Sequence, residues 1–277
     1  MGDLDGRTFV VTGANTGIGR VTAEALAKRG GKVILACRSE DKARPVVDAI
    51  VAAGGDAAFH ALDLADLAAT RRSAERLLAK DEPIHVLVNN AGLAGKRGQT
   101  KDGFELTFGT NHLGPFLFTR LLLPRLRESR PARVVNVSSG SHYGAHAIPW
   151  AQLRESTRSL TGIPEYNVSK LCQVLFTKSL ARGEAGEGVT SSSLHPGTMI
   201  ATDIWRTVPS FARPVLRLFM MPLEDGAKTT LHCATDPDVP AHDGDYWTDC
   251  ELKAPNPIAN DVALQDELWR RCEEWTR

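Results

Sequence analysis

The sequence predicts an α/β fold in which one doubly wound parallel sheet carries helices on both faces, within a single domain spanning residues 1–277. Two observations support this fold class. Apolar runs of strand length alternate with longer amphipathic stretches, and Gly, Pro, Asn and Asp separate them. A glycine-rich turn also follows the first apolar run. Such alternation favours parallel strands, because each right-handed crossover then carries a helix back across the sheet.

The elements follow one another in a regular order. The predicted strands are residues 8–12, 32–36, 57–61, 84–88, 133–137, 188–194 and 245–248. The predicted helices are residues 18–29, 41–53, 67–79, 104–127, 165–182, 223–234 and 260–275. Within the stretch 104–127, Pro115 predicts a kink or a turn, because proline cannot continue the helical hydrogen bonding.

Two long connections interrupt the alternation, residues 139–164 and residues 196–222. Long irregular connections in a compact domain usually have a function. We expect both to form walls of a substrate site, with 196–222 as its lid. Their apolar side chains favour a hydrophobic substrate, although ordinary packing explains them equally well: Trp150, Trp205, Phe211, Phe219 and Met220.

Composition narrows the classes of partner and site. The 33 basic residues balance the 33 acidic residues, which argues against a nucleic-acid-binding face. No apolar run is long enough to span a bilayer and the first residues lack a signal core, so we expect no membrane insertion. The five cysteines are odd in number and widely spaced, which favours reduced thiols in a cytoplasmic protein. His142 and His146 have no accompanying thiol or carboxylate cluster, so we expect no metal site.

The glycine-rich turn reads Thr12-Gly13-Ala14-Asn15-Thr16-Gly17-Ile18-Gly19 and separates the first predicted strand from the first helix. Glycine permits a tight turn and lets a pyrophosphate approach the backbone closely. The following helix offers unpaired N–H groups and the positive end of its dipole to a phosphate. The turn therefore predicts a dinucleotide site, and an ordinary strand-to-helix loop is the alternative.

Arg38 bears on the choice of dinucleotide, because the second predicted strand ends at Ala36-Cys37-Arg38. An acidic residue here would bind the 2′-hydroxyl of NAD, whereas arginine accommodates the 2′-phosphate of NADP. The guanidinium forms charge-assisted hydrogen bonds to phosphate. We therefore expect NADP(H), with NAD(H) less favoured; a surface arginine without a cofactor role is the alternative.

Tyr166 and Lys170 are four residues apart in a predicted helix, so their side chains lie on one face. A phenol with a pKa near 10 exchanges protons poorly at neutral pH, and a nearby ammonium lowers that pKa by roughly 1 to 3 units. Such tuning suits general acid/base catalysis. This pair alone is a frequent chance pattern. It gains weight from its place after the dinucleotide turn and the serine pair Ser138-Ser139.

Thr12-Gly-x-x-x-Gly-x-Gly and Tyr166-Asn-Val-Ser-Lys170 resemble the cofactor and active-site motifs of the short-chain dehydrogenase/reductase family, which has a Rossmann-type fold. The resemblance covers residues 6–275. It is strongest for the retinol dehydrogenase-like branch, through Asn111-His-Leu-Gly and Leu194-His-Pro-Gly. The two wall segments match no substrate class, so the resemblance does not imply activity on a retinoid.

The resemblance implies four catalytic residues. Tyr166 would be the proton donor and acceptor, and Ser139 would hydrogen-bond the substrate carbonyl, with Ser138 as the runner-up. Lys170 would lower the pKa of the phenol and bind the nicotinamide ribose. Asn111 would hold a proton-relay water next to the lysine.

The resemblance also implies the residues that line the cofactor site. Asp63 would hydrogen-bond the adenine amino group, although a role as a helix N-cap is equally plausible. The full expected set is Gly13, Asn15, Thr16, Gly17, Ile18, Gly19, Arg38, Asp63, Leu64, Asn90, Ala91, Gly92, Tyr166, Lys170, Pro196, Gly197 and Thr202.

Together these residues predict an NADP(H)-dependent oxidoreductase that transfers hydride between the nicotinamide and a small carbonyl or alcohol substrate. Two alternatives stay open: an epimerase or dehydratase of the same family, and a non-catalytic NADP(H)-sensing or scaffold protein. All four expected catalytic residues are present, which favours the enzyme. The resemblance implies a homodimer or homotetramer, but an insertion between Ser139 and Tyr166 leaves a monomer open.

Overall fold

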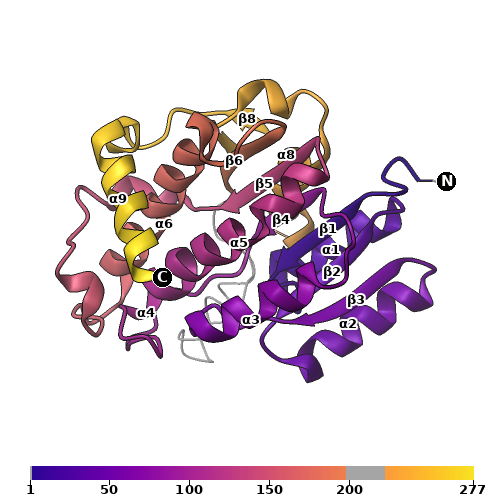
Figure 1. Ribbon diagram of the computed structural model, residues 1–277, viewed down its shortest axis with the longest axis horizontal. Helices are drawn as coiled ribbons and strands as arrows, with labels where there is room; N and C mark the ends of the chain where they lie inside the picture. Colours follow the sequence, from indigo (N-terminus) through magenta and orange to yellow (C-terminus); the bar gives the residue numbers. More distant parts are fainter. Residues whose placement is uncertain (1, 198–221) are drawn as a thin grey trace.

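The computed structural model describes residues 2–197 and 222–277. Its strands are β1 (Thr8–Thr12), β2 (Lys32–Cys37), β3 (Asp56–Ala61), β4 (Val86–Asn89), β5 (Ala132–Val137), β6 (Val189–His195), β7 (Tyr246–Thr248) and β8 (Glu251–Leu252). They form one sheet in the order β3-β2-β1-β4-β5-β6-β7-β8 (Figure 1). Neighbours pair in parallel as far as β7, and β8 is antiparallel to it. The predicted single α/β domain with a doubly wound sheet is therefore confirmed, and β8 is an addition that the sequence did not predict.

The helices cover both faces of the sheet (Figure 1). One face carries α1 (Gly17–Lys28), α2 (Glu40–Ala52) and α8 (Leu223–Thr235). The other carries α3 (Leu67–Leu78), α5 (Gly114–Glu128), α6 (Ile163–Ser179) and α9 (Val262–Trp275). Among the described residues, no helix combines the length and the apolar character that crossing a membrane would require.

The strands join two hydrophobic cores, one on each face. Val10 and Ile34 belong to the core beneath α3, α5 and α6, whereas Phe9, Val11 and Val33 belong to the core beneath α1 and α2. Successive strand residues point to opposite faces, so a strand covered on both sides is apolar throughout. Each such side chain contributes roughly 1.5 to 3 kcal/mol by its burial. This double burial holds the strand ends rigidly in place.

The predicted helix 104–127 is interrupted. It consists of the short α4 (Leu106–Phe108), a π-helical turn η1 (Gly109–Leu113) and then α5. Pro115 lies in the first turn of α5, where proline is tolerated, but it has no N–H to donate to the carbonyl of Asn111 four residues earlier. The expected break near Pro115 is therefore present, and it takes the form of the π turn that contains Asn111.

The long connection before α6 is packed against the domain. It contains two 3-10 turns, η2 (Gly140–Gly144) and η3 (Gln152–Arg154), and buries Ile148 in the core. The Trp150 ring lies 4.7 Å from the Arg271 guanidinium carbon and packs against the same core. Of the expected apolar wall residues, Trp150 thus has a packing role, and Trp205, Phe211, Phe219 and Met220 lie outside the described residues together with most of the predicted lid.

Candidate active site

The expected site residues gather at the carboxyl ends of the central parallel strands. The glycine turn follows β1, Asn90 follows β4, Ser139 comes soon after β5 and Pro196 follows β6. In open α/β sheets, ligands bind outside these strand ends, at the point where the strand order reverses. Here the order reverses between β1 and β4, next to the glycine turn.

The glycine turn is packed so closely that side chains are excluded. Gly13 and Gly17 have φ angles of 67° and 57°, in the left-handed region that glycine tolerates. A Cβ atom on Gly19 would lie 2.4 Å from Nδ2 of Asn90, and one on Gly13 would lie 2.9 Å from the Cα atom of Ala91. Side chains at these two positions would therefore collide with Asn90 and Ala91, so glycine is required at both.

Asn90 and Ala91 fix this turn to β1. The Thr12 hydroxyl accepts hydrogen bonds from the backbone N–H groups of Asn90 (3.0 Å) and Ala91 (2.9 Å). Nδ2 of Asn90 donates to the Thr12 carbonyl at 2.8 Å. Beyond them, the Cα atom of Gly92 approaches Asn111 and Lys170, since an added Cβ would lie 3.5 Å from the Lys170 ammonium nitrogen. The segment therefore joins the glycine turn to two of the expected catalytic residues.

A dinucleotide phosphate fits this turn for reasons visible in the structure. Helix α1 begins at Gly17 and has no acidic side chain in its first turn, so its N–H groups and dipole favour an anion. Asn15 is partly exposed on the turn and Thr16 is exposed, whereas the Ile18 side chain packs inward. Arg38 is exposed just beyond the end of β2. An exposed guanidinium at this position is free to bind the 2′-phosphate of NADP, as expected from the sequence.

The residues after β3 differ in part from expectation. Oδ1 of Asp63 accepts from the Ala65 N–H at 3.0 Å, whereas Asp66 caps α3 by accepting from Ala69. The alternative that Asp63 is the helix N-cap is therefore wrong, because the helix begins one turn later. The side chain of Leu64 is 6% exposed and lies in the core.

The residues after β6 are described only at their start. Pro196 and Gly197 are partly exposed, and Gly197 has a φ angle of 116°. Thr202 lies outside the described residues.

The Ser139 side chain faces the Tyr166 phenol and acts to lower its pKa. Ser138 is 2% exposed, and its hydroxyl donates to the backbone carbonyl of Lys170 at 2.9 Å. The two serines follow the end of β5, and each has a different partner. The geometry thus brings Ser139 to the phenol and uses Ser138 to attach α6 to the end of β5.

Lys170 is buried at 4% exposure and lies beside the phenol. Its Nζ is 5.6 Å from the centroid of the Tyr166 ring. It donates to the Val137 carbonyl at 2.8 Å and to Oε1 of Gln173 at 3.2 Å. Burial disfavours the charged amine and lowers the pKa of Lys170 to about 7.

The expectation that Lys170 lowers the pKa of Tyr166 is wrong in this structure. The pKa of Tyr166 is raised above its ordinary value because burial penalises the phenolate, and the Ser139 side chain opposes this increase. Lys170 does not offset the effect, since its hydrogen bonds go to neutral oxygens and its own charge is weakened by burial. The surroundings thus favour the protonated phenol.

Asn111 is fully buried in the π turn, and its side chain is already engaged. Its Oδ1 accepts from the Leu93 N–H, and its Nδ2 donates to the Leu93 carbonyl, both at 2.9 Å. Nδ2 also donates to the Ser169 hydroxyl at 3.0 Å. The backbone carbonyl of Asn111 accepts from Nε2 of Gln173 at 2.7 Å. Gln173 therefore contacts two of the expected catalytic residues; its place three residues after Lys170 on the same helix face is the one sequence signal for it.

His142 is a second residue that the catalytic assignment missed. Its Nδ1 lies 2.7 Å from the Ser139 carbonyl, and its Nε2 accepts from the Asn256 N–H at 3.0 Å. Nδ1 must therefore carry the proton. Nδ2 of Asn256 donates to the carbonyls of His142 and Ala145. Both ring nitrogens of His142 are thus used to hold the turn of Ser139, and no local spacing reveals a partner so distant in the sequence.

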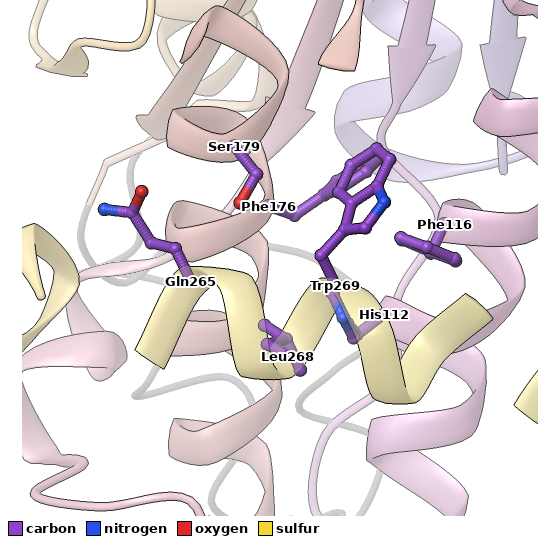
Figure 2. Close-up of a pocket in the computed structure, with 7 residues that line it drawn as sticks. All are labelled: His112, Phe116, Phe176, Ser179, Gln265, Leu268 and Trp269. Carbon is purple, nitrogen blue, oxygen red and sulfur yellow. The ribbon is translucent and has the colours of Figure 1, made fainter. Parts of the chain in front are cut away.

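A small pocket lies apart from these residues, in the seam between α9, α6 and α5 (Figure 2). The space between its side chains amounts to about 140 Å³, part of it open to solvent, and is too narrow to hold a water molecule. Its lining is His112, Phe116, Phe176, Ser179, Gln265, Leu268 and Trp269. The pocket is a packing seam between helices, and it contains none of the expected catalytic residues.

Comparison with known proteins agrees with this arrangement. The family model described as short chain dehydrogenase matches residues 7–212. Human retinol dehydrogenase 11 is 40% identical over 278 residues, which cover 96% of this chain and 84% of the relative. Dehydrogenase/reductase SDR family member 13 of Bos taurus is 38% identical over 97% of this chain and 73% of its own length.

Solved structures show the same architecture. An uncharacterised protein of Mycobacterium paratuberculosis superposes with a TM-score of 0.79 at 32% identity, over 100% of this chain and 98% of the other. A protein described as an NAD(P)-dependent gluconate 5-dehydrogenase of Beutenbergia cavernae, with NADP bound at low occupancy, has a TM-score of 0.69 at 26% identity over 89% and 96% of the two chains. The motifs, the strand order and these relatives lead to one conclusion: the chain belongs to the short-chain dehydrogenase/reductase family.

Proposed function

We propose that this protein is an NADP(H)-dependent oxidoreductase that transfers hydride between the nicotinamide and a carbonyl/alcohol pair on an apolar substrate. One observation carries the proposal: the Tyr166 phenol lies beside the buried Lys170, 5.6 Å from its Nζ to the ring centroid, and faces the Ser139 side chain, which lowers its pKa. The retinol dehydrogenase relatives, whose named substrate is an apolar alcohol, support this class of reaction.

In carbonyl reduction, Tyr166 donates the phenol proton to the substrate oxygen while Ser139 hydrogen-bonds the same oxygen. Burial favours the neutral phenol, which is the proton-carrying form that reduction needs. The cofactor supplies or removes the hydride when it is bound, and the protein contributes position and electrostatics. Asn111 holds the Leu93 backbone and Ser169 close to this centre.

The chain also offers residues for each part of NADP(H). The turn from Gly13 to Gly19 would hold the pyrophosphate, and Arg38 would hold the 2′-phosphate. Lys170 would bind the nicotinamide ribose. The backbone of Pro196 and Gly197 would lie next to the nicotinamide ring. The neighbour of known structure with NADP bound supports the preference for the phosphorylated cofactor. A cytoplasmic location and a homodimer or homotetramer stay predictions.

The test is NADPH oxidation with a panel of apolar aldehydes and ketones. We expect Tyr166→Phe to lower kcat by about 10²- to 10⁴-fold, because the proton donor is lost. Tyr246→Phe is the matched control, since it removes a phenol oxygen from the buried sheet, and it should retain activity. Tight NADPH binding with no turnover on any substrate would instead favour a cofactor-sensing protein.

A further inference from the structure

Gln173 bridges two of the proposed catalytic residues. Its side chain is 1% exposed. Oε1 accepts a hydrogen bond from Nζ of Lys170 at 3.2 Å, and Nε2 donates to the backbone carbonyl of Asn111 at 2.7 Å. Both ends of one carboxamide are therefore occupied by groups of the candidate active site.

The π turn explains why the backbone carbonyl of Asn111 is available to accept a hydrogen bond from a side chain. Residues 109–113 leave the usual i to i−4 pattern, and a break in that pattern requires other partners for the backbone groups around it. The turn joins α4 to α5 immediately opposite α6, which carries both Lys170 and Gln173. The Gln173 amide thus satisfies the backbone of the π turn and, through its oxygen, orients the lysine.

We propose that Gln173 is a positioning residue that fixes the Lys170 amine beside Tyr166. Its carboxamide connects the Asn111 carbonyl to this amine, at the place where the family resemblance predicts a water. The inference rests on the proposed function, because it assigns a role within the same site. A carboxamide cannot rotate and exchange like a water. The Gln173 carboxamide therefore holds the Lys170 amine in one place. Its oxygen accepts a hydrogen bond from the amine but, unlike a water, cannot carry a proton away.

A purely structural role would not explain the choice of partners. Gln265, a buried glutamine of α9 in the seam of Figure 2, donates to the Ala259 carbonyl at 2.8 Å and leaves its oxygen without a partner among the described residues. Gln173 uses both ends, and its oxygen faces the amine. An oxygen acceptor favours the ammonium form of a lysine, whereas burial disfavours it.

Charged side chains near Lys170 do not set its pKa. On the strands and turns around Lys170, the titratable side chains are Arg133 on β5, His112 on η1, His142 and Tyr143 on η2 and His195 at the end of β6; α6 itself also carries Glu165, Tyr166, Cys172 and Lys178. Among the described residues, burial is the cause that moves the pKa of Lys170, and no charged neighbour contributes. The oxygens of Val137 and Gln173 are thus the local groups that counteract burial.

The experiment titrates Lys170 directly in cofactor-free protein. Lysine is labelled with ¹³C at Cε, and the Lys170 signal is assigned by its loss in Lys170→Met. We expect Gln173→Leu to lower the pKa of Lys170 by about one unit, a tenfold loss of the charged form, and Gln173→Glu to raise it by at least as much. Gln265→Leu, the matched control, should leave the titration unchanged.

A second readout is the pH dependence of kcat with a carbonyl substrate and NADPH. The apparent pKa that Lys170 contributes to this profile should shift in the same direction as its pKa from the NMR titration, for each Gln173 variant. An unchanged Lys170 titration in both variants would overturn the proposal, and Gln173→Glu keeps it testable if the leucine variant does not fold. A shifted titration in a protein that turns over no carbonyl would support the role of Gln173 while refuting the proposed function.

Discussion

The amine of Lys170 is almost completely removed from water, and the oxygens that it contacts are neutral. Its pKa of about 7 lies far below the ordinary value of 10.5. A pKa this low makes the charge of the lysine sensitive to pH near neutrality. The cost of burying this amine must also appear in the stability of the protein.

Lys170→Met tests that cost. Between pH 7 and pH 10.5 the unfolded chain holds a proton that the folded chain releases, so the free energy of unfolding rises with pH over this range. From pH 7 to pH 9.5, wild type should gain roughly 2 to 3 kcal/mol relative to Lys170→Met. Urea unfolding at the two pH values measures the difference. Lys28→Met, on the exposed end of α1, should follow wild type, and an equal response in both variants would contradict the prediction.

The proposed preference for NADPH depends on Arg38. Arg38→Ala should raise the KM for NADPH by about 10- to 100-fold, because a charge-assisted hydrogen bond to phosphate contributes roughly 1.5 to 3 kcal/mol. The KM for NADH should change little. Steady-state kinetics with both cofactors provide the measurement. Arg270→Ala, which removes an exposed ion-paired arginine from α9, is the control; equal losses with NADPH and NADH would refute the assignment.

At the scale of elements, the turn η2 connects the end of β5 to the C-terminal part of the chain. His142 links the Ser139 carbonyl to the Asn256 N–H, and Asn256 in turn holds the carbonyls of His142 and Ala145. The backbone of Ser139 is therefore held, through His142, by Asn256, which lies more than a hundred positions away in the sequence. We infer that this clamp limits the movement of Ser139 toward and away from the phenol.

Asn256→Ala removes the side-chain part of the clamp. We expect the free energy of unfolding to fall by about 1 to 3 kcal/mol, because two buried carbonyls lose their donor. We also expect kcat/KM to fall, because Ser139 is then less well placed. Chemical denaturation and steady-state kinetics measure the two effects. The exposed Asn260 supplies the control variant Asn260→Ala; lower stability with unchanged kcat/KM would limit the clamp to a structural role.

At the scale of the whole molecule, α5, α6 and α9 meet in an aromatic seam (Figure 2). The His112 ring lies there, 5.4 Å from Phe108 and 6.0 Å from Phe176 between ring centroids. Its Nε2 is 3.4 Å from Sγ of Cys272. Burial lowers the pKa of His112 to about 3, so the seam accepts the neutral imidazole.

The seam should make the fold sensitive to acid. Below pH 6.5 the unfolded chain protonates His112 while the folded chain does not, so stability is lost as the pH falls toward 3. Between pH 7 and pH 4.5, His112→Phe should lose roughly 2 to 3 kcal/mol less than wild type. Urea unfolding at both pH values tests this. His146→Gln, at an exposed position, should respond like wild type; an identical acid response in His112→Phe would show that the burial of this imidazole is not the cause.

Much of the fold could be predicted from local patterns. The strands were located to within one or two residues because a strand covered on both faces must be apolar along its length. The break near Pro115 was also predictable, but its π-helical form was not, since Pro115 excludes a backbone donor without specifying how the preceding turn closes. The strand β8 is too short to produce a pattern.

The sequence by itself determined the family, the glycine turn and the Tyr166–Lys170 pair, because each depends on residues a few positions apart on one turn or one helix face. Only the tertiary structure bonded Ser138 to the Lys170 carbonyl and turned Ser139 toward the phenol, reversed the expected direction of the Tyr166 pKa, and brought Gln173 to Asn111. The physical reason is that desolvation and hydrogen-bond partners depend on what the fold packs around a group, and these neighbours come from elements that are distant in the chain.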